Sequence, residues 1–282
     1  MPIQIPKMEL HDRKVINNLL QKYNLLAKKK FGQNFLTSKI PICDIVEAAK
    51  VTKEDTVIEV GPGLGILTRE LSSHAKKVIS LELDRTLLPL LAETLNDCEN
   101  VEIINRDALK YIPLKISYKI VANIPYNITS HLINHFLRTE NQPTSITLLV
   151  QKEVAEKICV LDPDMTVLSL QIALFGKAKI MKKVPSTYFY PQPKVDSAII
   201  HIELFQKNDP NFIPQEKALK ILKVAKICFS NRRKKLSNTL PKEYHSQAIK
   251  SGINLSRRPE TLSTQEWAAI CLDDTVPQPQ PN

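Results

Sequence analysis

The chain has 282 residues, of which 43% are apolar and 24% charged, a balance typical of globular proteins. Its 6 glycine and 19 proline residues are too few for a fibrous or low-complexity protein. The net charge of +10 is concentrated in residues 1–39, which carry +6, and residues 206–260, which carry +9, whereas residues 40–205 carry −2. This distribution favours a polyanionic partner over one without charge, although a solvated basic surface remains an equal alternative on charge alone.

The sequence also indicates a cellular compartment. No apolar run approaches the roughly 20 residues that span a bilayer, and the first residues lack the basic-then-apolar order of a signal peptide. Five cysteines are scattered along the chain without a C-x-x-C pair, which argues against a disulfide framework and a zinc site. We therefore expect a cytoplasmic protein with reduced thiols, no bound metal and no membrane association.

The first part of the chain predicts helices around a basic segment. Residues 1–27 have the apolar spacing of a helical arm. The basic segment Lys28, Lys29 and Lys30 follows, and residues 39–50 again have helical spacing.

From residue 56 onward, short apolar runs alternate with amphipathic stretches. The runs predict strands at residues 56–60, 77–81, 101–104, 118–122 and 146–150, with helices between them. This alternation is typical of a doubly wound, Rossmann-like α/β fold with a mostly parallel sheet. Later runs near residues 178–184 and 195–204 predict additional strands at the far edge of the sheet.

A polar, proline-containing segment at residues 206–214 predicts a domain boundary. The expected organisation is an N-terminal helical arm (1–27), an α/β domain (28–205), a small all-helical domain (206–275) and a disordered tail (276–282).

Polar or glycine residues follow three consecutive predicted strands. Gly61 and Gly63 follow the first strand, Glu82 ends the second and Asp107 ends the third. Ligands of open α/β sheets bind at these strand ends, where a carboxylate such as Glu82 can accept both ribose hydroxyls and Asp107 an adenine edge. Because no phosphate-loop lysine follows the glycines, the set indicates an adenosine-bearing cofactor without a phosphate cradle.

The segment Asn123-Ile124-Pro125-Tyr126 follows the fourth strand and matches the motif of enzymes that methylate exocyclic amines. The amino group of adenine is a poor nucleophile because its lone pair is delocalised into the ring. The amide oxygen of Asn123 and a backbone carbonyl can accept its two N–H groups and direct the lone pair at a methyl group. Pro125 stiffens the turn, and Tyr126 offers a ring on which an extruded base can stack.

With these motifs the chain resembles the small-subunit rRNA adenine N6-dimethyltransferases, the KsgA/RsmA family, over about residues 22–272. Six stretches carry the resemblance in family order: residues 30–36, 57–65, 123–127, 151–155, 190–197 and 229–236. The second stretch is shared by many S-adenosylmethionine enzymes, and the other five are more specific. The arm before Gln21 is longer than is usual in the family, and the sequence assigns it no role.

The resemblance implies a class I methyltransferase sheet and a pocket for S-adenosylmethionine, with S-adenosylhomocysteine as the product. The implied cofactor-binding residues are Gln33, Asn34, Leu36, Gly61, Gly63, Glu82, Asp107 and Asn123. Asn123, Tyr126 and Phe189 would act at the target adenine, with Phe189 as the second ring that sandwiches the base. The implied contacts to the rRNA backbone are Lys28, Lys29, Lys30, Arg232, Arg233, Lys234 and Lys235.

The function implied by the resemblance is dimethylation of two adjacent adenines in the 3′-terminal hairpin loop of 16S rRNA, within an assembling 30S particle, by a monomeric enzyme. A large-subunit rRNA adenine methyltransferase of the macrolide-resistance type, a DNA adenine methyltransferase and a non-catalytic assembly factor remain alternatives. The stretches at residues 30–36 and 229–236 favour the small-subunit enzyme, and the intact Asn123 and Tyr126 argue against a non-catalytic factor.

Overall fold

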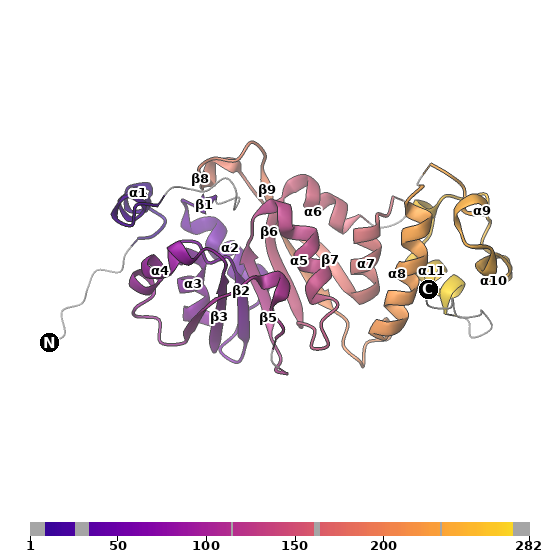
Figure 1. Ribbon diagram of the computed structural model, residues 1–282, viewed down its shortest axis with the longest axis horizontal. Coiled ribbons are helices and arrows are strands. Elements are labelled where there is room, and N and C mark those ends of the chain that lie inside the picture. Colours follow the sequence, from indigo (N-terminus) through magenta and orange to yellow (C-terminus); the bar gives the residue numbers. More distant parts are fainter. Residues whose placement is uncertain (1–8, 26–33, 114, 161–163, 232, 273–282) are drawn as a thin grey trace. The chain divides into compact units, whose positions relative to one another are not determined.

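The computed structural model describes residues 9–25, 34–113, 115–160, 164–231 and 233–272 (Figure 1). The chain forms two compact units: one extends to Ala155 and includes Lys179–Glu203, and the other comprises Glu156–Ala178 and the residues from Leu204 onward. In the described ranges, no helix is both long and apolar enough to cross a bilayer.

The first unit is built on the mixed sheet that the sequence predicts. Its strands lie in the order β4 (Val101–Asn105), β3 (Lys77–Glu82), β2 (Thr56–Val60), β5 (Lys119–Asn123), β6 (Ser145–Gln151), β9 (Ser197–Leu204) and β7 (Gly176–Val184). The first five strands are parallel, and β9 pairs antiparallel with β6. The two late strands that the sequence predicts are present at this edge, with β9 between β6 and β7.

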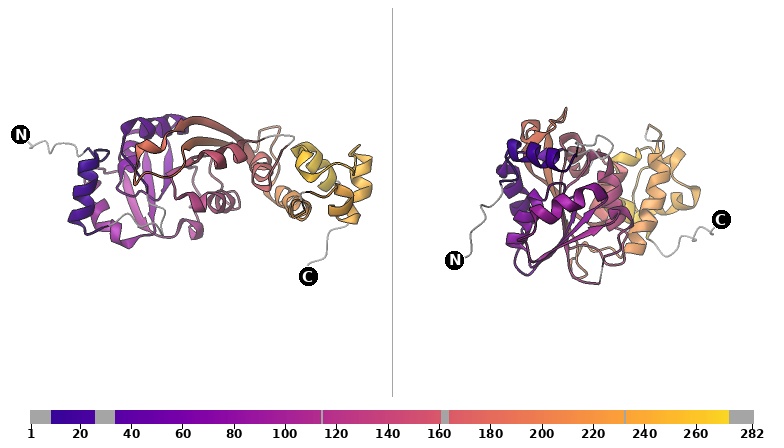
Figure 2. Two further views of the ribbon diagram at one scale, coloured as in Figure 1. Left: turned by 90° about the horizontal axis from the view of Figure 1, so that it is seen from above. Right: turned by 60° about the vertical axis from the view of Figure 1, so that its left-hand side comes forward.

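Helices cover both faces of the sheet, as Figures 1 and 2 show for α2 and α5. The α-helices that follow β1 in this unit are α2 (Lys39–Ala49), α3 (Ile66–His74), α4 (Leu88–Thr94), α5 (Thr129–Phe136) and the start of α6 (Lys152–Cys159). Val57 of β2, Val121 of β5 and Leu149 of β6 lie on the same face of the sheet. They pack in a buried cluster with residues of α2 and α3. The neighbours of these residues along the strands, such as Ile58 and Leu148, are equally buried, so the central strands have apolar contacts on both faces.

The second unit is mostly helical. It contains α7 (Val167–Phe175), α8 (Gln215–Phe229), α9 (Leu236–Thr239), α10 (His245–Lys250) and α11 (Thr264–Cys271). Phe229 of α8 and the fully buried Trp267 of α11 lie with ring centroids 6.1 Å apart in its core. The sequence prediction placed residues 156–178 in the α/β domain, whereas in the structure α7 packs against α8 and α11 and is apolar on nearly every side.

Two further elements lie beside the main sheet. The predicted arm contains α1 (Arg13–Lys22), which begins at the N-cap Asp12. A two-stranded antiparallel sheet joins β1 (Phe35–Leu36) to β8 (Phe189–Tyr190), with Phe35 opposite Tyr190 and Leu36 opposite Phe189.

Candidate active site

A cavity of 320 Å³ lies at the carboxyl ends of the parallel strands. The chain runs outward from β2 to β3 and β4 and then returns to β5 on the other side of β2. At this reversal the loops after β2 and β5 diverge, which is where ligands bind in open α/β sheets. The loops after β2, β3, β4 and β5, together with residues 34–36, line the cavity.

The glycine loop after β2 forms one wall of the cavity. Gly61, Gly63 and Gly65 have φ values of 72°, 59° and 85°, a region that other residues adopt only with strain. A Cβ atom at Gly63 would lie 3.4 Å from the ring of Phe35, at ordinary van der Waals contact, so the ring packs beside the glycine loop. Glycine at this position therefore serves the turn, while Phe35 forms the adjoining part of the cavity wall.

Glu82 is a buried carboxylate in the cavity lining, at the end of β3. Burial raises its pKa to about 7, although hydrogen bonds from the backbone amides of Asp84 and Gly63 oppose the shift. The amide of Asp84 donates to Oε1 at 2.6 Å and fixes the orientation of the carboxylate. Because the buried carboxylate of Glu82 is poorly solvated, hydrogen bonds donated by the hydroxyl groups of a ligand would stabilise its negative charge.

Asp107, at the loop after β4, has two roles. Its Oδ1 accepts a hydrogen bond from the backbone N–H of Leu109 at 2.9 Å and so caps a short 3-10 helix. The same residue lines the cavity. The cap fixes the Asp107 carboxylate at the cavity, where the sequence predicts a contact to an adenine edge.

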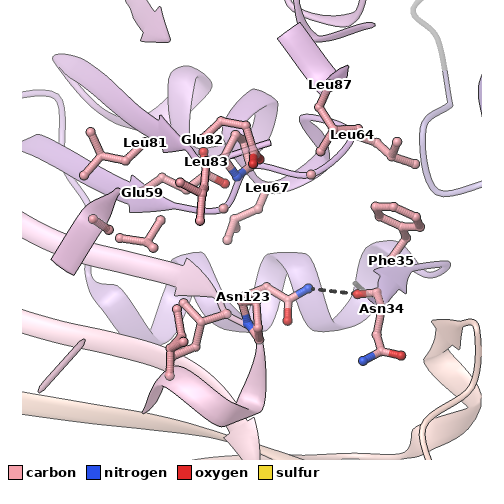
Figure 3. A pocket seen from close by; sticks show the side chains of 18 of the residues that line it. Asn34, Phe35, Glu59, Leu64, Leu67, Leu81, Glu82, Leu83, Leu87 and Asn123 are labelled. Carbon is pink, nitrogen blue, oxygen red and sulfur yellow. Dashed lines mark hydrogen bonds between the residues drawn. The ribbon is translucent and has the colours of Figure 1, made fainter. Parts of the chain in front are cut away.

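Asn123 lies at the end of β5 and across the cavity from the glycine loop (Figure 3). Its Nδ2 donates to the backbone carbonyl of Asn34 at 3.4 Å, which links β5 to the residue before β1. Because the amide nitrogen makes this contact, the amide oxygen is the atom that can accept hydrogen bonds from a ligand.

Tyr126 follows Asn123 in the same loop and also lines the cavity. Its hydroxyl shares a hydrogen bond of 2.7 Å with the hydroxyl of Ser197, a fully buried residue at the start of β9. Burial raises the pKa of the Tyr126 phenol, so this residue stays protonated at neutral pH. The contact fixes the ring of Tyr126 from a strand far away in sequence.

The structure thus brings together eight of the residues singled out from the sequence. All of them line this cavity: Asn34, Leu36, Gly61, Gly63, Glu82, Asp107, Asn123 and Tyr126. Phe189 is placed differently, because it is 4% exposed and packs in the apolar cluster opposite Leu36, outside the cavity lining.

The basic residues are described only in part. Arg233, Lys234 and Lys235 are exposed in the second unit. Gln33, Lys28, Lys29, Lys30 and Arg232 lie outside the described residues.

Glu59 is a cavity residue that the sequence analysis missed. It occupies the interior of β2, is 1% exposed, and accepts hydrogen bonds of 2.6 Å from both Thr68 of α3 and Ser80 of β3. Burial raises its pKa to about 7. Its signal in the sequence is a carboxylate within a mostly apolar strand, two residues before the first glycine of the loop.

Comparisons with known proteins identify relatives of nearly the whole chain. The family model described as ribosomal RNA adenine dimethylase matches residues 24–272. Relatives named ribosomal RNA small subunit methyltransferase A include one from Dehalococcoides mccartyi, 39% identical over 90% of this chain and 91% of the relative. Another, from Clostridium botulinum, is 38% identical over 92% of this chain and 98% of the relative.

Solved structures show the same architecture. The 23S rRNA methyltransferase ErmE is 27% identical with a TM-score of 0.69, over 84% of this chain and 98% of that one. A dimethyladenosine transferase from Plasmodium falciparum is 25% identical with a TM-score of 0.70, over 84% of this chain and 96% of that one.

Proposed function

The chain belongs to the ribosomal RNA adenine dimethylase family, and from that premise we propose that it dimethylates two adjacent adenines in the 3′-terminal hairpin loop of small-subunit rRNA. It is an S-adenosylmethionine-dependent methyltransferase, as its family and the fold of its sheet establish. One observation supports the specific chemistry best: residues suited to an adenosine cofactor, Glu82 and Asp107, line the same cavity as Asn123 and Tyr126.

The residues of the cavity fit S-adenosylmethionine. The volume of 320 Å³ falls within the range of small-molecule sites, and the buried Glu82 provides the acceptor that two ribose hydroxyls require. Glycines at positions 61 and 63 allow a ligand close to the backbone. When bound, the cofactor supplies a methyl group already activated by its positive sulfur, so the protein contributes mainly proximity and orientation.

Asn123 would orient the target amine. Its amide oxygen accepts an N–H of adenine N6, while its amide nitrogen remains on the carbonyl of Asn34. Accepting this hydrogen bond draws the nitrogen of the amine toward tetrahedral geometry and concentrates its lone pair. After the first transfer the amine has one hydrogen left, which Asn123 can still accept, so the same contact serves the second transfer.

We expect Ser197 to act through Tyr126. Replacing Ser197 with alanine removes the hydroxyl that fixes the stacking ring and should raise the KM for RNA about fivefold, the effect of one hydrogen bond of about 1 kcal/mol. Tyr126→Phe loses the same bond and should match it, and the double variant should add no further loss. Steady-state kinetics test this, with the exposed Ser73→Ala on α3 as the control. Additive losses in the double variant would exclude coupling between the two hydroxyls.

The raised pKa of Glu82 predicts a pH dependence of cofactor affinity. In the free protein this carboxyl takes up a proton as the pH falls through about 7, and a protonated carboxyl accepts ribose hydroxyls less well. The dissociation constant of S-adenosylhomocysteine should therefore be constant above pH 8 and rise by up to tenfold per unit below about pH 7. Calorimetry across this range tests the effect, and Glu82→Gln should flatten the curve. A slope that survives in Glu82→Gln and disappears in Glu59→Gln would assign the titration to the other carboxyl.

The proposed partner is the small-subunit rRNA in an assembling 30S particle. We propose that this chain binds it as a monomer in the cytoplasm. The net charge of +9 on residues 206–260 and the exposure of Arg233, Lys234 and Lys235 support contacts to the phosphate backbone. Contacts of this kind position the enzyme, and the target base is selected at the cavity.

A large-subunit substrate is the second candidate, since a 23S rRNA methyltransferase shares the fold at 27% identity. The higher identity of 38–39% to relatives named for the small subunit favours the first proposal. Methyl transfer to unmethylated small and large ribosomal subunits, with the nucleosides identified by mass, separates the two. Dimethyladenosine only in small-subunit RNA is the expected result, and label in large-subunit RNA would transfer the function to the second candidate.

A further inference from the structure

The N-terminal arm has no role in the proposed chemistry, yet its described residues, 9–25, include several that are buried in the first unit. In α1, Ile16, Leu19 and Leu20 form an apolar stripe at helical spacing and are each at most 8% exposed. Leu10 and Leu25, on either side of the helix, are also buried. An arm attached only by its chain connection would leave such residues exposed.

The apolar residues of α1 pack in the same cluster as part of the cavity wall. They share that buried cluster with Phe35, Leu64 and Leu87. These three also line the cavity, and Figure 3 shows them together on one side of it. The apolar residues of α1 and a ligand in the cavity would therefore pack against one cluster of side chains.

Polar contacts hold the two ends of α1 to different elements. The Arg13 guanidinium lies 4.6 Å from the ring centroid of Tyr190 in β8, within the range of a cation–π contact. At the other end, Lys22 forms an ion pair of 2.6 Å with Glu93 of α4, and the hydroxyl of Tyr23 donates to the same carboxylate. The helix thus connects β8 with α4, as its position beside α4 in Figure 1 illustrates.

The two-stranded sheet β1–β8 lies between two apolar clusters. Leu36 and Phe189 face the core formed with α2 and α3, whereas Phe35 packs with the residues of α1. The ring of Phe35 also lies against Gly63, where a Cβ atom would be 3.4 Å away, at ordinary van der Waals contact. Without α1, the cluster that contains Phe35 would lose the apolar side chains that α1 contributes.

We propose that α1 is a positioning element of the cofactor site, which holds Phe35 and α4 in place so that the glycine-loop wall of the cavity is formed before the cofactor binds. The inference rests on the proposed function, because it assigns the cavity to S-adenosylmethionine. Preorganisation of this kind acts on affinity, since a wall that must be ordered on binding weakens the complex. The chemical step, which depends on Asn123 and Tyr126, is unaffected once the cofactor is saturating.

Calorimetric titration of the full chain with S-adenosylhomocysteine tests the proposal. The variant with Ile16→Ala and Leu19→Ala empties the interface, and we expect it to bind about tenfold more weakly because preorganisation is lost. Its kcat at saturating S-adenosylmethionine should stay within about twofold of the unaltered chain, so that the defect is one of KM. Asn17→Ala, an exposed position on the same helix, is the matched control and should bind normally.

Two milder variants keep the test informative if the double variant is poorly folded. Arg13→Ala releases the exposed contact to Tyr190 without opening the core, and Glu93→Gln weakens the attachment to α4. Each should weaken binding about threefold, an effect smaller than one full hydrogen bond to a charged group. Unchanged affinity together with a lower Tm would overturn the proposal and leave α1 a purely stabilising element. Absence of binding by the unaltered chain would overturn the proposed function itself.

Discussion

Replacing Asn123 with alanine should lower kcat for methyl transfer about 10²–10³-fold, the loss typical of removing one preorganised hydrogen-bonding group at a reacting centre. The variant lacks the acceptor for the target amine and also the link from β5 to the carbonyl of Asn34. The affinity for S-adenosylhomocysteine should fall far less, because Glu82 and Asp107 remain. Single-turnover methyl transfer, with affinity measured in parallel, checks both parts.

A second substitution at this position separates the two contacts of Asn123. Asn123→Asp retains an acceptor for the amine but places a carboxylate oxygen against the carbonyl of Asn34, which repels it. We expect this variant to be intermediate in rate, whereas Asn238→Ala, at an exposed position in α9, should be unaffected. If Asn123→Ala kept the full rate, the assignment of target-amine orientation to this residue would be wrong.

Glu82→Ala is expected to have the largest effect on cofactor affinity. Two hydrogen bonds from ribose hydroxyls to a carboxylate, at about 1.5 kcal/mol or more each, correspond to at least a 100-fold weaker complex. Their loss should appear in the KM for S-adenosylmethionine, with kcat close to that of the unaltered chain when the cofactor can be saturated. Calorimetry with S-adenosylhomocysteine provides the direct measurement.

Two companion variants define the origin of that loss. Glu82→Gln keeps the shape and one acceptor, so its affinity should lie between those of Glu82→Ala and the unaltered chain. Glu54→Ala removes an exposed carboxylate before β2 and should bind normally. Equal affinity for Glu82→Ala and the unaltered chain would contradict the placement of the ribose at this strand end.

Much of the first unit could be predicted from the sequence because its central strands are buried on both faces. Such strands are continuous apolar runs, and the prediction of residues 56–60 coincides with β2. Because helices alternate with these strands, the strands were expected to be parallel, with their carboxyl ends at one edge of the sheet. The residues at the ends of β2, β3 and β5 were therefore expected at one site. The structure does place Gly61, Glu82 and Asn123 around one cavity.

Features that depend on packing between distant segments were not predictable. The insertion of β9 between β6 and β7 requires pairing across residues far apart in sequence, and alternation alone does not specify it. The grouping of α7 with α8 and α11 has the same origin, because the hydrophobic pattern of α7 shows burial but not its partner.

At the site, sequence reasoning was least informative about contacts between side chains. Glu59 was read only as part of a predicted apolar strand. The hydrogen bonds that it accepts from Thr68 and Ser80 depend on the packing of α3 and β3 against β2. The pairing of Tyr126 with Ser197 joins residues 71 positions apart. Phe189 was assigned to the target base by resemblance, whereas its ring here packs in the buried cluster that includes Leu36, and its part in base binding stays a prediction.

The most direct test of the central claim is to analyse rRNA from a bacterial strain that lacks its own small-subunit dimethyltransferase and expresses this chain. Mass analysis of the 3′-terminal fragment of small-subunit rRNA should show dimethyladenosine at two adjacent positions with the unaltered chain and none with Asn123→Ala. Unmodified adenines in that fragment with the unaltered chain, in cells where it is folded and binds S-adenosylhomocysteine, would contradict the proposed function.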